Sequence, residues 1–279
     1  MRYFMTYGDQ LYAQSKKRLA QEAEATGLFD HVKTFSPDDL PESLKTHPLM
    51  QYRRGGGYWL WKPYLINEVL KTLNENDILV YADSGCSINQ SDEWNLFFNN
   101  LKHKSVVLFC LGYQNKYYCR QSLLTYASQK EAYWGNYQQV LSGFIILRKT
   151  QESCNLITDW LQLMSRHPEY VMDVNKEERC HEAPYFREKR HDQSALNACL
   201  YNYRHSVCLR WENVELLHPF NKQALLASRL SDKNPTRTMP AMNLRKYFTR
   251  TFIGRPLFTI RHLFWEQMSR LHPSKKPVS

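Results

Sequence analysis

Asp83 stands where an apolar run gives way to a tight turn, in the string ILVYADSG of residues 78–85. This pattern predicts the end of a central strand, and ligands of open α/β sheets collect at the carboxyl ends of strands. A carboxylate there could hold Mg²⁺ or Mn²⁺, since these ions often use one or two carboxylates together with substrate phosphates. Ser84 and Gly85 are small enough to let a ligand approach the backbone. Alternatively, Asp83 only favours the turn, and Gly85 supplies a positive φ.

A second group of candidate residues lies upstream, in the string RRGGGYWLWKPY of residues 53–64. Three glycines are framed there by Arg53, Arg54 and Lys62, and the tryptophans include Trp61. Cations beside a flexible backbone suit a phosphate and can stabilise charge on a leaving diphosphate. The string matches neither a Walker loop nor a dinucleotide fingerprint. Alternatively, it is a surface loop whose tryptophans pack into the core.

The third group, His191, Asp192 and Gln193, stands at the expected start of a helix. Asp192 could act in a cleft as a base, an electrostatic stabiliser or an orienter of a hydroxyl group. His191 and His218, the latter in the string LLHPF of residues 216–220, could ligate a metal. The alternatives are ordinary helix capping for Asp192 and a structural role for each histidine.

The elements that must position these side chains alternate along the chain. Apolar runs predict strands, and helical spacing of apolar residues predicts helices between them. The expected strands cover residues 2–6, 29–35, 78–82, 105–111 and 142–148, and the expected helices cover residues 10–26, 117–128, 151–164 and the stretches after Pro63 and Asp192. This alternation predicts an α/β fold with a mainly parallel central sheet, flanked by helices and carrying its sites along one edge.

The composition narrows the class of protein. A chain of 279 residues with 43% apolar and 14% aromatic side chains fits one large globular domain, or a domain with an appended piece. Seven cysteines without a Cys-x-x-Cys pair predict free, mostly buried thiols in a reducing compartment. No window reaches about 18 uninterrupted apolar residues, and the start does not resemble a signal peptide, so we expect a cytoplasmic protein.

The formal charge of +10 is concentrated near the C-terminus, where residues 237–279 hold nine lysines and arginines against Glu266 alone, a balance of +8. We expect a domain over residues 1–227, a linker over 228–240 and a basic amphipathic segment over 241–279. Aromatic and aliphatic stripes between arginines suit an interfacial helix on an anionic membrane surface. A helix packed on its own domain is the alternative. Nucleic acid would also attract the charge, but no reading motif is recognisable, so we expect no nucleic-acid partner.

The motifs resemble those of bacterial surface-polysaccharide (lipopolysaccharide or capsule) glycosyltransferases of the nucleotide-diphospho-sugar (GT-A, Rossmann-like) fold. The similar strings are TYGD at residues 6–9, GYWLWKPY at 57–64, YADSG at 81–85 and HDQSALN at 191–197, the last also resembling a segment of glycogenin and of lipooligosaccharide galactosyltransferases. The resemblance covers roughly residues 1–225. It implies a nucleotide-diphosphate sugar donor and a saccharide or lipid-linked saccharide acceptor.

The resemblance also implies roles for individual residues. The nucleotide base would lie near Thr6, Tyr7 and Gly8, and the rest of the donor beside a second set, namely Trp61, Lys62, Asp83, Ser84 and Gly85. A metal at Asp83 would hold the diphosphate, and Asp192 and Gln193 would face the transferred sugar. The family usually carries Asp-x-Asp, whereas this chain has Gly85 in the second position. The metal would therefore use His218 or another residue as its second ligand, or would be held weakly.

The sequence therefore predicts a cytoplasmic, peripheral-membrane glycosyltransferase on the inner face of the membrane. Lys62, the metal and backbone amides would stabilise charge on the departing diphosphate. Two other functions stay open. One is a non-catalytic module of the same fold that binds a nucleotide or glycan, and the other is a nucleic-acid-binding protein that uses the basic tail.

Overall fold

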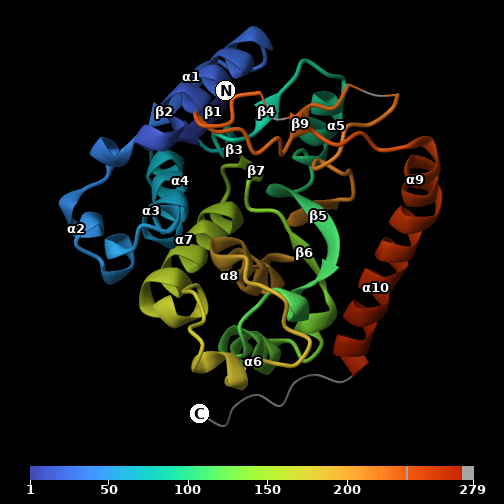
Figure 1. Cartoon of the computed structure of the whole chain (residues 1–279). Coiled ribbons are helices and arrows are strands. Elements are labelled where there is room, and N and C mark those ends of the chain that lie inside the picture. The colour runs from blue at the N-terminus through green and yellow to red at the C-terminus, as the bar shows by residue number, and fades with distance from the viewer. Residues whose placement is uncertain (221, 237, 272–279) are drawn as a thin grey trace.

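The computed structural model describes residues 1–220, 222–236 and 238–271 (Figure 1). The strands are β1 (Arg2–Tyr7), β2 (His31–Phe35), β3 (Ile78–Ala82), β4 (Ser87–Ile88), β5 (Val106–Gln114), β6 (Gln138–Val140), β7 (Phe144–Arg148), β8 (Val207–Arg210) and β9 (Leu225–Leu226). The helices are α1 (Ala13–Ala25), α2 (Glu42–Lys45), α3 (Gly55–Tyr58), α4 (Trp61–Thr72), α5 (Glu93–Asn100), α6 (Gln121–Lys130), α7 (Gln151–Arg166), α8 (His191–Leu200), α9 (Leu244–Phe248) and α10 (Arg255–Leu271).

The central sheet has the strand order β2-β1-β3-β7-β5-β6, and β8 also pairs with β5. Strand β1 is parallel to β2 and β3, while β7 is antiparallel to both β3 and β5. Strand β8 is parallel to β5, and β6 is antiparallel to it. Within the described ranges, five of the seven strands of this sheet thus run in one direction. The predicted α/β fold, with a mainly parallel sheet flanked by helices, is confirmed.

Both faces of the sheet are buried, which explains the continuous apolar runs in the sequence. Along β3, Leu79 and Tyr81 belong to one hydrophobic cluster, and Val80 and Ala82 belong to the other. Helices α4, α6, α7 and α8 contribute to the first cluster, whereas α1 and α5 contribute to the second (Figure 1). The sheet therefore holds its strand ends in a rigid frame between two packed layers.

Several boundaries differ from the sequence-based expectation. The first helix opens as a 3₁₀ turn at Gln10–Tyr12, and α4 begins at Trp61, two residues before the proline. Helix α6 begins only at Gln121, because the backbone of Arg120 is still extended. Strand β6 was not predicted, since a three-residue strand with two glutamines has no apolar run to reveal it.

The segment 228–240, which we expected to be a linker, contacts the N-terminal part of the chain. The Asp232 carboxylate accepts hydrogen bonds from the N–H groups of Gln14 and Ser15 at 2.9 and 2.8 Å and so caps the start of α1. The N–H of Leu230 donates to the Gly85 carbonyl at 2.8 Å. The division into domain, linker and tail stays a prediction.

The C-terminal segment is helical, as predicted, through α9, a π-helical turn at Thr249–Gly254 and α10. Residues 272–279 of the expected tail lie outside the described residues. The ring of Phe258 on α10 stacks on Trp211 just after β8, with centroids 5.7 Å apart, so the helix packs along the sheet edge (Figure 1). None of the helices in the described ranges is both long and apolar enough to cross a membrane.

All seven cysteines are free thiols, as the sequence predicted. Cys86, Cys110, Cys119 and Cys199 are buried, and Cys180 is exposed. Burial raises the pKa of the Cys119 thiol to about 12, so this sulfur is protonated and unreactive at neutral pH.

Candidate functional site

Three turns meet at one edge of the central sheet. Strand β1 ends at Tyr7 and is followed by Gly8, and the turn after β3 carries Asp83. Both strands end at this edge because they are parallel. Strand β7 runs the other way, so Ser142 and Gly143, which precede it, reach the same edge. These turns line a cavity of about 570 Å³. Its size lies within the ~300–1,000 Å³ typical of small-molecule sites.

The floor of this cavity holds a buried ammonium group between two carboxylates. Lys62 is 1% exposed, and its Nζ donates to Asp192 Oδ2 at 2.8 Å and lies 3.0 Å from Asp83 Oδ1. Burial lowers the pKa of Lys62, but the two carboxylates outweigh burial, so the net pKa is raised and the ammonium stays charged at neutral pH. Two carboxylates and one ammonium leave a formal charge of −1 on the floor. We call Lys62, Asp83 and Asp192 the ion triad.

The two carboxylates of the ion triad differ in exposure. The Asp83 side chain is 38% exposed, whereas the Asp192 side chain is 8% exposed. Tyr81 donates its hydroxyl to Asp83 Oδ1 at 2.5 Å, and Ser142 donates its hydroxyl to Asp192 Oδ2 at 2.9 Å. One oxygen of each carboxylate is therefore occupied by protein donors, and Asp83 offers more surface to a ligand.

A left-handed turn forms the wall next to the ion triad. Five consecutive residues from Gly55 to Trp59 have positive φ angles of 58, 56, 96, 51 and 61°. Glycine adopts this conformation without strain, whereas each other residue is strained by about 1–2 kcal/mol. A Cβ on Gly57 would lie 2.4 Å from the Met50 sulfur and 2.8 Å from the Met50 Cα. The glycines therefore build a defined wall rather than a flexible loop.

The same wall is fastened to α4 by aromatic side chains. Trp61 donates its indole N–H to the Gly55 carbonyl at 2.9 Å. Its ring stacks on Tyr7, with centroids 3.8 Å apart and an interplanar angle of 23°. Both rings line the cavity although they are almost fully buried.

The contacts of His191 define its protonation state. Its Nδ1 lies 2.7 Å from the Val171 carbonyl oxygen, which can only accept, so Nδ1 carries the proton. Its Nε2 then accepts the Arg54 Nε–H at 3.0 Å. Burial lowers the pKa of His191, which agrees with a neutral ring. Neither ring nitrogen is left for a metal or for proton transfer, and His191 instead orients Arg54.

Gln193 belongs to a hydrogen-bonded network behind the cavity wall. Its Nε2 donates to Gln139 Oε1 at 2.7 Å, and Gln139 Nε2 donates to Ser194 Oγ at 3.3 Å. The backbone carbonyl of Asp192 accepts the indole N–H of Trp160 at 2.9 Å. Satisfied buried networks of this kind hold side chains in one arrangement, so the start of α8 is a rigid part of the site.

Cationic side chains surround the upper part of the cavity, and we call them the cationic rim: Arg53, Arg54, Lys189, Arg190 and Arg229. Arg190 pairs with Glu188 and Arg229 pairs with Glu215, each at 2.7 Å. Burial, assisted by Arg120 and opposed by Asp173, lowers the pKa of Lys189 to about 8. The rim thus includes one lysine whose charge changes near physiological pH.

The structure brings most of the sequence-predicted residues together. The ten that line the cavity are Tyr7, Gly8, Trp61, Lys62, Asp83, Ser84, Gly85, His191, Asp192 and Gln193. Thr6 does not line it, because its side chain is fully buried in β1. His218 does not line it either; its ring contacts Tyr247 of α9, with centroids 5.7 Å apart. The roles of all these residues stay predictions.

The donor atoms around Asp83 do not form the predicted metal site. In the described part of the chain, no three His, Cys, Asp or Glu side chains lie close enough together to hold a metal ion. His218 is outside the cavity, and the Lys62 ammonium lies 3.0 Å from Asp83. A lysine cation in contact with the Asp83 carboxylate disfavours a second cation at that carboxylate. The residues present therefore do not fit the expected pair of Asp83 and His218 as a metal site.

Sequence reasoning missed Ser142 and Gly143. A Cβ on Gly143 would lie 3.1 Å from Asp83 Oδ2, so a side chain here would press on the carboxylate. The available signal was a Ser-Gly pair directly before an apolar strand. This signal is informative only when the strand is known to be antiparallel. In a parallel sheet the site residues come after a strand, not before it.

Comparisons with known proteins give no family for this chain. No protein-family model matches it, and no curated protein matches it. Among solved structures, the galactosyltransferase LgtC in complex with donor and acceptor sugar analogs is 15% identical over 94% of this chain and 95% of its own, with a TM-score of 0.41. A glycosyltransferase involved in glycosylation of the major capsid of PBCV-1 is 11% identical over 75% and 82%, with a TM-score of 0.40.

The bifunctional glycosyltransferase WbbM is 11% identical over 95% of this chain, with a TM-score of 0.45, and the chain spans 44% of its length. Similarity at this level carries no weight for the activity of this chain, so a function has to be supported by its own residues.

Proposed function

We propose that this chain is a glycosyltransferase that moves a sugar from a nucleotide-diphosphate donor to a saccharide or lipid-linked saccharide acceptor in surface-polysaccharide synthesis. One observation carries the proposal: a single cavity at the strand ends combines the cationic rim with the acidic floor of the ion triad. A nucleotide-diphosphate sugar is complementary to this cavity. Its anionic diphosphate suits the cationic rim, and the hydroxyl donors of its sugar suit the acidic floor. The sequence motifs resemble the same class of enzyme.

The diphosphate is assigned to the cationic rim. As the bond between the anomeric carbon and the diphosphate oxygen breaks, negative charge grows on the diphosphate, and fixed cations stabilise it. Arg54 is held in place by His191, which suits a bidentate contact with phosphate oxygens. The sequence assigned this role to Lys62, but the Lys62 side chain is almost fully buried. In the proposal Lys62 instead holds the two carboxylates.

The sugar is assigned to the floor. The exposed carboxylate of Asp83 accepts hydrogen bonds from sugar hydroxyls, and Asp192 orients the transferred sugar or accepts the proton of the acceptor hydroxyl. The acceptor oxygen forms the new bond to the anomeric carbon as the diphosphate leaves. The nucleotide base lies against Tyr7 and Gly8 at the end of β1. Every step uses this chain's own residues, because Asp83 and His218 do not form the expected pair of metal ligands.

A thermal-shift panel of nucleotide sugars followed by a transfer assay tests the proposal. A donor that binds the folded state raises the melting temperature, and transfer releases the nucleotide diphosphate. Asp83→Asn and Asp192→Asn should each reduce transfer by at least about a hundredfold, whereas Glu68→Gln on the exposed side of α4 should not change it.

The panel is run with manganese and with a chelator, and we expect equal activity in both. A strict metal requirement would overturn the assignment of the diphosphate to the cationic rim. Binding without any transfer would favour the non-catalytic binding module. No shift with any donor, or full activity of both Asn variants, would refute the proposed site.

We further propose that α9, the π-helical turn and α10 attach the protein to the inner, cytoplasmic face of an anionic membrane. The exposed large apolar side chains of this segment are Leu244, Phe248, Phe252, Ile253, Leu257, Ile260, Leu263, Phe264 and Leu271. Phe252 is 67% exposed, and arginines such as Arg245 stand beside these residues. Exposed phenylalanines add affinity for the acyl boundary but none for phosphates, so lipid explains the segment better than nucleic acid.

Vesicle flotation separates these two partners. We expect binding to vesicles that contain phosphatidylglycerol, weaker binding to phosphatidylcholine alone, and a large loss in the Phe248→Ser, Phe252→Ser double variant. The matched control replaces Leu96, an exposed apolar residue of α5, by serine. Binding to duplex DNA that depends on the tail, without binding to vesicles, would contradict the membrane proposal.

A further inference from the structure

Carboxylates of this chain partly neutralise the cationic rim of the candidate site. Glu188 pairs with Arg190, and Glu215 pairs with Arg229; both glutamates line the cavity. A third carboxylate, that of Asp173, lies against the rim without lining the cavity. A carboxylate beside a phosphate-binding cation weakens the hold of that cation on an anion. The position of Asp173 therefore bears on how the rim binds a ligand.

Asp173 contacts two cations of the rim at once. Its Oδ2 lies 3.3 Å from Nε of Arg54, and its Oδ1 lies 3.7 Å from Nζ of Lys189. The same Oδ1 lies 4.0 Å from Nε2 of His191, the residue that orients Arg54. Arg54 and Lys189 therefore share one counterion.

The carboxylate of Asp173 is held in place by Tyr58. The Tyr58 hydroxyl donates to Asp173 Oδ2 at 3.2 Å and accepts the Asp173 N–H, also at 3.2 Å. Tyr58 belongs to the left-handed turn that forms the cavity wall, and Arg54 directly precedes this turn. Asp173 is thus fastened to the same rigid wall as the arginine whose charge it offsets.

The contact between Arg54 and Asp173 contributes little to the stability of the fold. The two side chains are 56% and 47% exposed, and ion pairs exposed to this extent are screened by solvent and contribute little or nothing measurable. Asp173 therefore acts mainly on the charge that a ligand meets at the rim.

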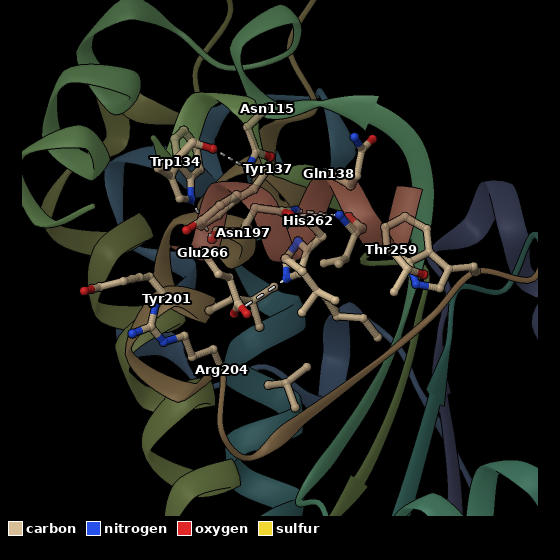
Figure 2. A pocket seen from close by; sticks show the side chains of 16 residues that line it. Asn115, Trp134, Tyr137, Gln138, Asn197, Tyr201, Arg204, Thr259, His262 and Glu266 are labelled. Carbon is tan, nitrogen blue, oxygen red and sulfur yellow. Dashed lines mark hydrogen bonds and ion pairs between the residues drawn. The ribbon is translucent and has the colours of Figure 1, made fainter. Parts of the chain in front are cut away.

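A second cavity, beside α10, offers no comparable surface to an anion (Figure 2). It has a volume of about 270 Å³. In the described residues its lining holds one arginine and one glutamate, Arg204 and Glu266, whose charges cancel. His262 adds no charge at neutral pH, because burial lowers its pKa. The rim of the candidate site is thus the better complement to an anionic ligand.

We infer that Asp173 is a specificity-determining residue, a fixed counter-charge that limits how tightly the cationic rim holds a diphosphate. The inference rests on the proposed function, in which the diphosphate binds this rim. When the bond between the anomeric carbon and the diphosphate oxygen breaks, that oxygen keeps the bonding electron pair. The product therefore carries one negative charge more than the diphosphate of the donor, and the rim attracts it more strongly. Asp173 offsets part of this attraction and lets the nucleotide diphosphate leave.

The test is calorimetric titration of the full chain with pyrophosphate at about pH 6.5, where the Lys189 ammonium is charged. Asp173→Asn removes the charge but keeps an acceptor for the Tyr58 hydroxyl. Pyrophosphate should bind about three- to tenfold more tightly to this variant, as expected from one or two exposed charge contacts. The matched control is Glu177→Gln, because Glu177 is exposed in the same segment and the change removes the same charge. Its effect should stay below about twofold.

Two further measurements separate an effect of charge from a change of structure. At about 1 M KCl the Debye length is about 3 Å, so the gain in Asp173→Asn should fall below about twofold there. Asp173→Ala also removes the acceptor for Tyr58, and an equal gain in both variants assigns the effect to the lost charge. Melting temperatures within about 2 °C of the wild type show that both variants are folded.

The outcomes distinguish a failure of this inference from a failure of the proposed function. Equal or weaker pyrophosphate binding by Asp173→Asn, with binding by the wild type, overturns the inference and leaves the rim as the diphosphate site. Weaker binding would make Asp173 a positioning residue for Arg54. A gain that persists at about 1 M KCl also overturns the inference. No binding by any variant up to about 10 mM refutes the assignment of the diphosphate to the rim, and the inference with it.

The transfer assay tests the role in product release. In Asp173→Asn the inhibition constant of the nucleotide diphosphate should fall by a larger factor than the KM of the donor, because the product carries the additional charge. Equal changes of the two constants would contradict a role of Asp173 in product release.

Discussion

Replacing Lys62 by methionine tests the ion triad, the feature on which the floor of the candidate site depends. At an effective dielectric constant of about 20, a contact of 2.8 Å between unit charges has a gross energy of about 6 kcal/mol. The contact with Asp83 counts for only about 0–1 kcal/mol, because that side chain is 38% exposed and screened by solvent. Desolvation of the ammonium offsets several kcal/mol of the gross gain.

The variant leaves the buried carboxylate of Asp192 without its cation. Breaking a buried pair in this way destabilises a protein by about 3–5 kcal/mol, so Lys62→Met should lower the free energy of unfolding by this amount. Urea denaturation followed by circular dichroism measures the change. The control is Lys71→Met on the same helix, whose side chain is 62% exposed and pairs with Glu68, and we expect a loss of at most about 0.5 kcal/mol.

A second variant shows whether the lost stability is electrostatic. In the Lys62→Met background, Asp192→Asn removes the unpaired charge and keeps an acceptor for the Ser142 hydroxyl. The double variant should regain about 2 kcal/mol relative to Lys62→Met. A loss below about 1 kcal/mol in Lys62→Met, or no recovery in the double variant, would refute the assignment of a stabilising buried triad.

Three further outcomes are expected from other residues. Gly57→Ala should destabilise the protein by more than about 3 kcal/mol, because the new Cβ meets the backbone of Met50. Gly56→Ala has space for its Cβ and should cost only the backbone strain of about 1–2 kcal/mol. Equal losses of stability in urea denaturation would contradict this. Because the pKa of Lys189 is lowered to about 8, its ammonium charge is present below that pH and lost above it. The affinity for pyrophosphate should therefore fall between about pH 7 and 9. In Lys189→Arg the affinity should stay constant over this range. Cys180 should react first with a maleimide in the native protein, and mass spectrometry that finds another thiol labelled first would refute the burial pattern.

The parts of the fold that the sequence predicted are those with long apolar runs. Strands β1, β3 and β7 each bury several consecutive apolar residues, so their positions follow from the pattern alone. Their directions do not, because a strand buried on both faces looks the same in either direction. This is why the antiparallel β7 and the site residue Gly143 before it were not foreseen.

The candidate site was likewise predictable only in part. Asp83 and Asp192 were predicted from local signals, a strand end and a helix start, and the structure places both in one cavity. The burial of Lys62 between them was not predictable, since it depends on three elements that are distant in sequence. His218 shows the opposite case, because a histidine beside a proline carries no local signal of where its ring points.

The left-handed turn and the ion triad depend on each other. The turn ends at Trp59, and Lys62 follows within the first turn of α4, so the turn sets the direction from which the ammonium enters the floor. Tyr58 and Trp59 together carry about 2–4 kcal/mol of left-handed strain, which packing must offset. Two contacts together supply enough stabilisation to offset this strain. They are the charge contact of Lys62 with Asp192 and the stack of Trp61 on Tyr7. Loss of the charge contact, the larger of the two supports, should therefore release the turn, and with it the orientation of Arg54 on the cationic rim.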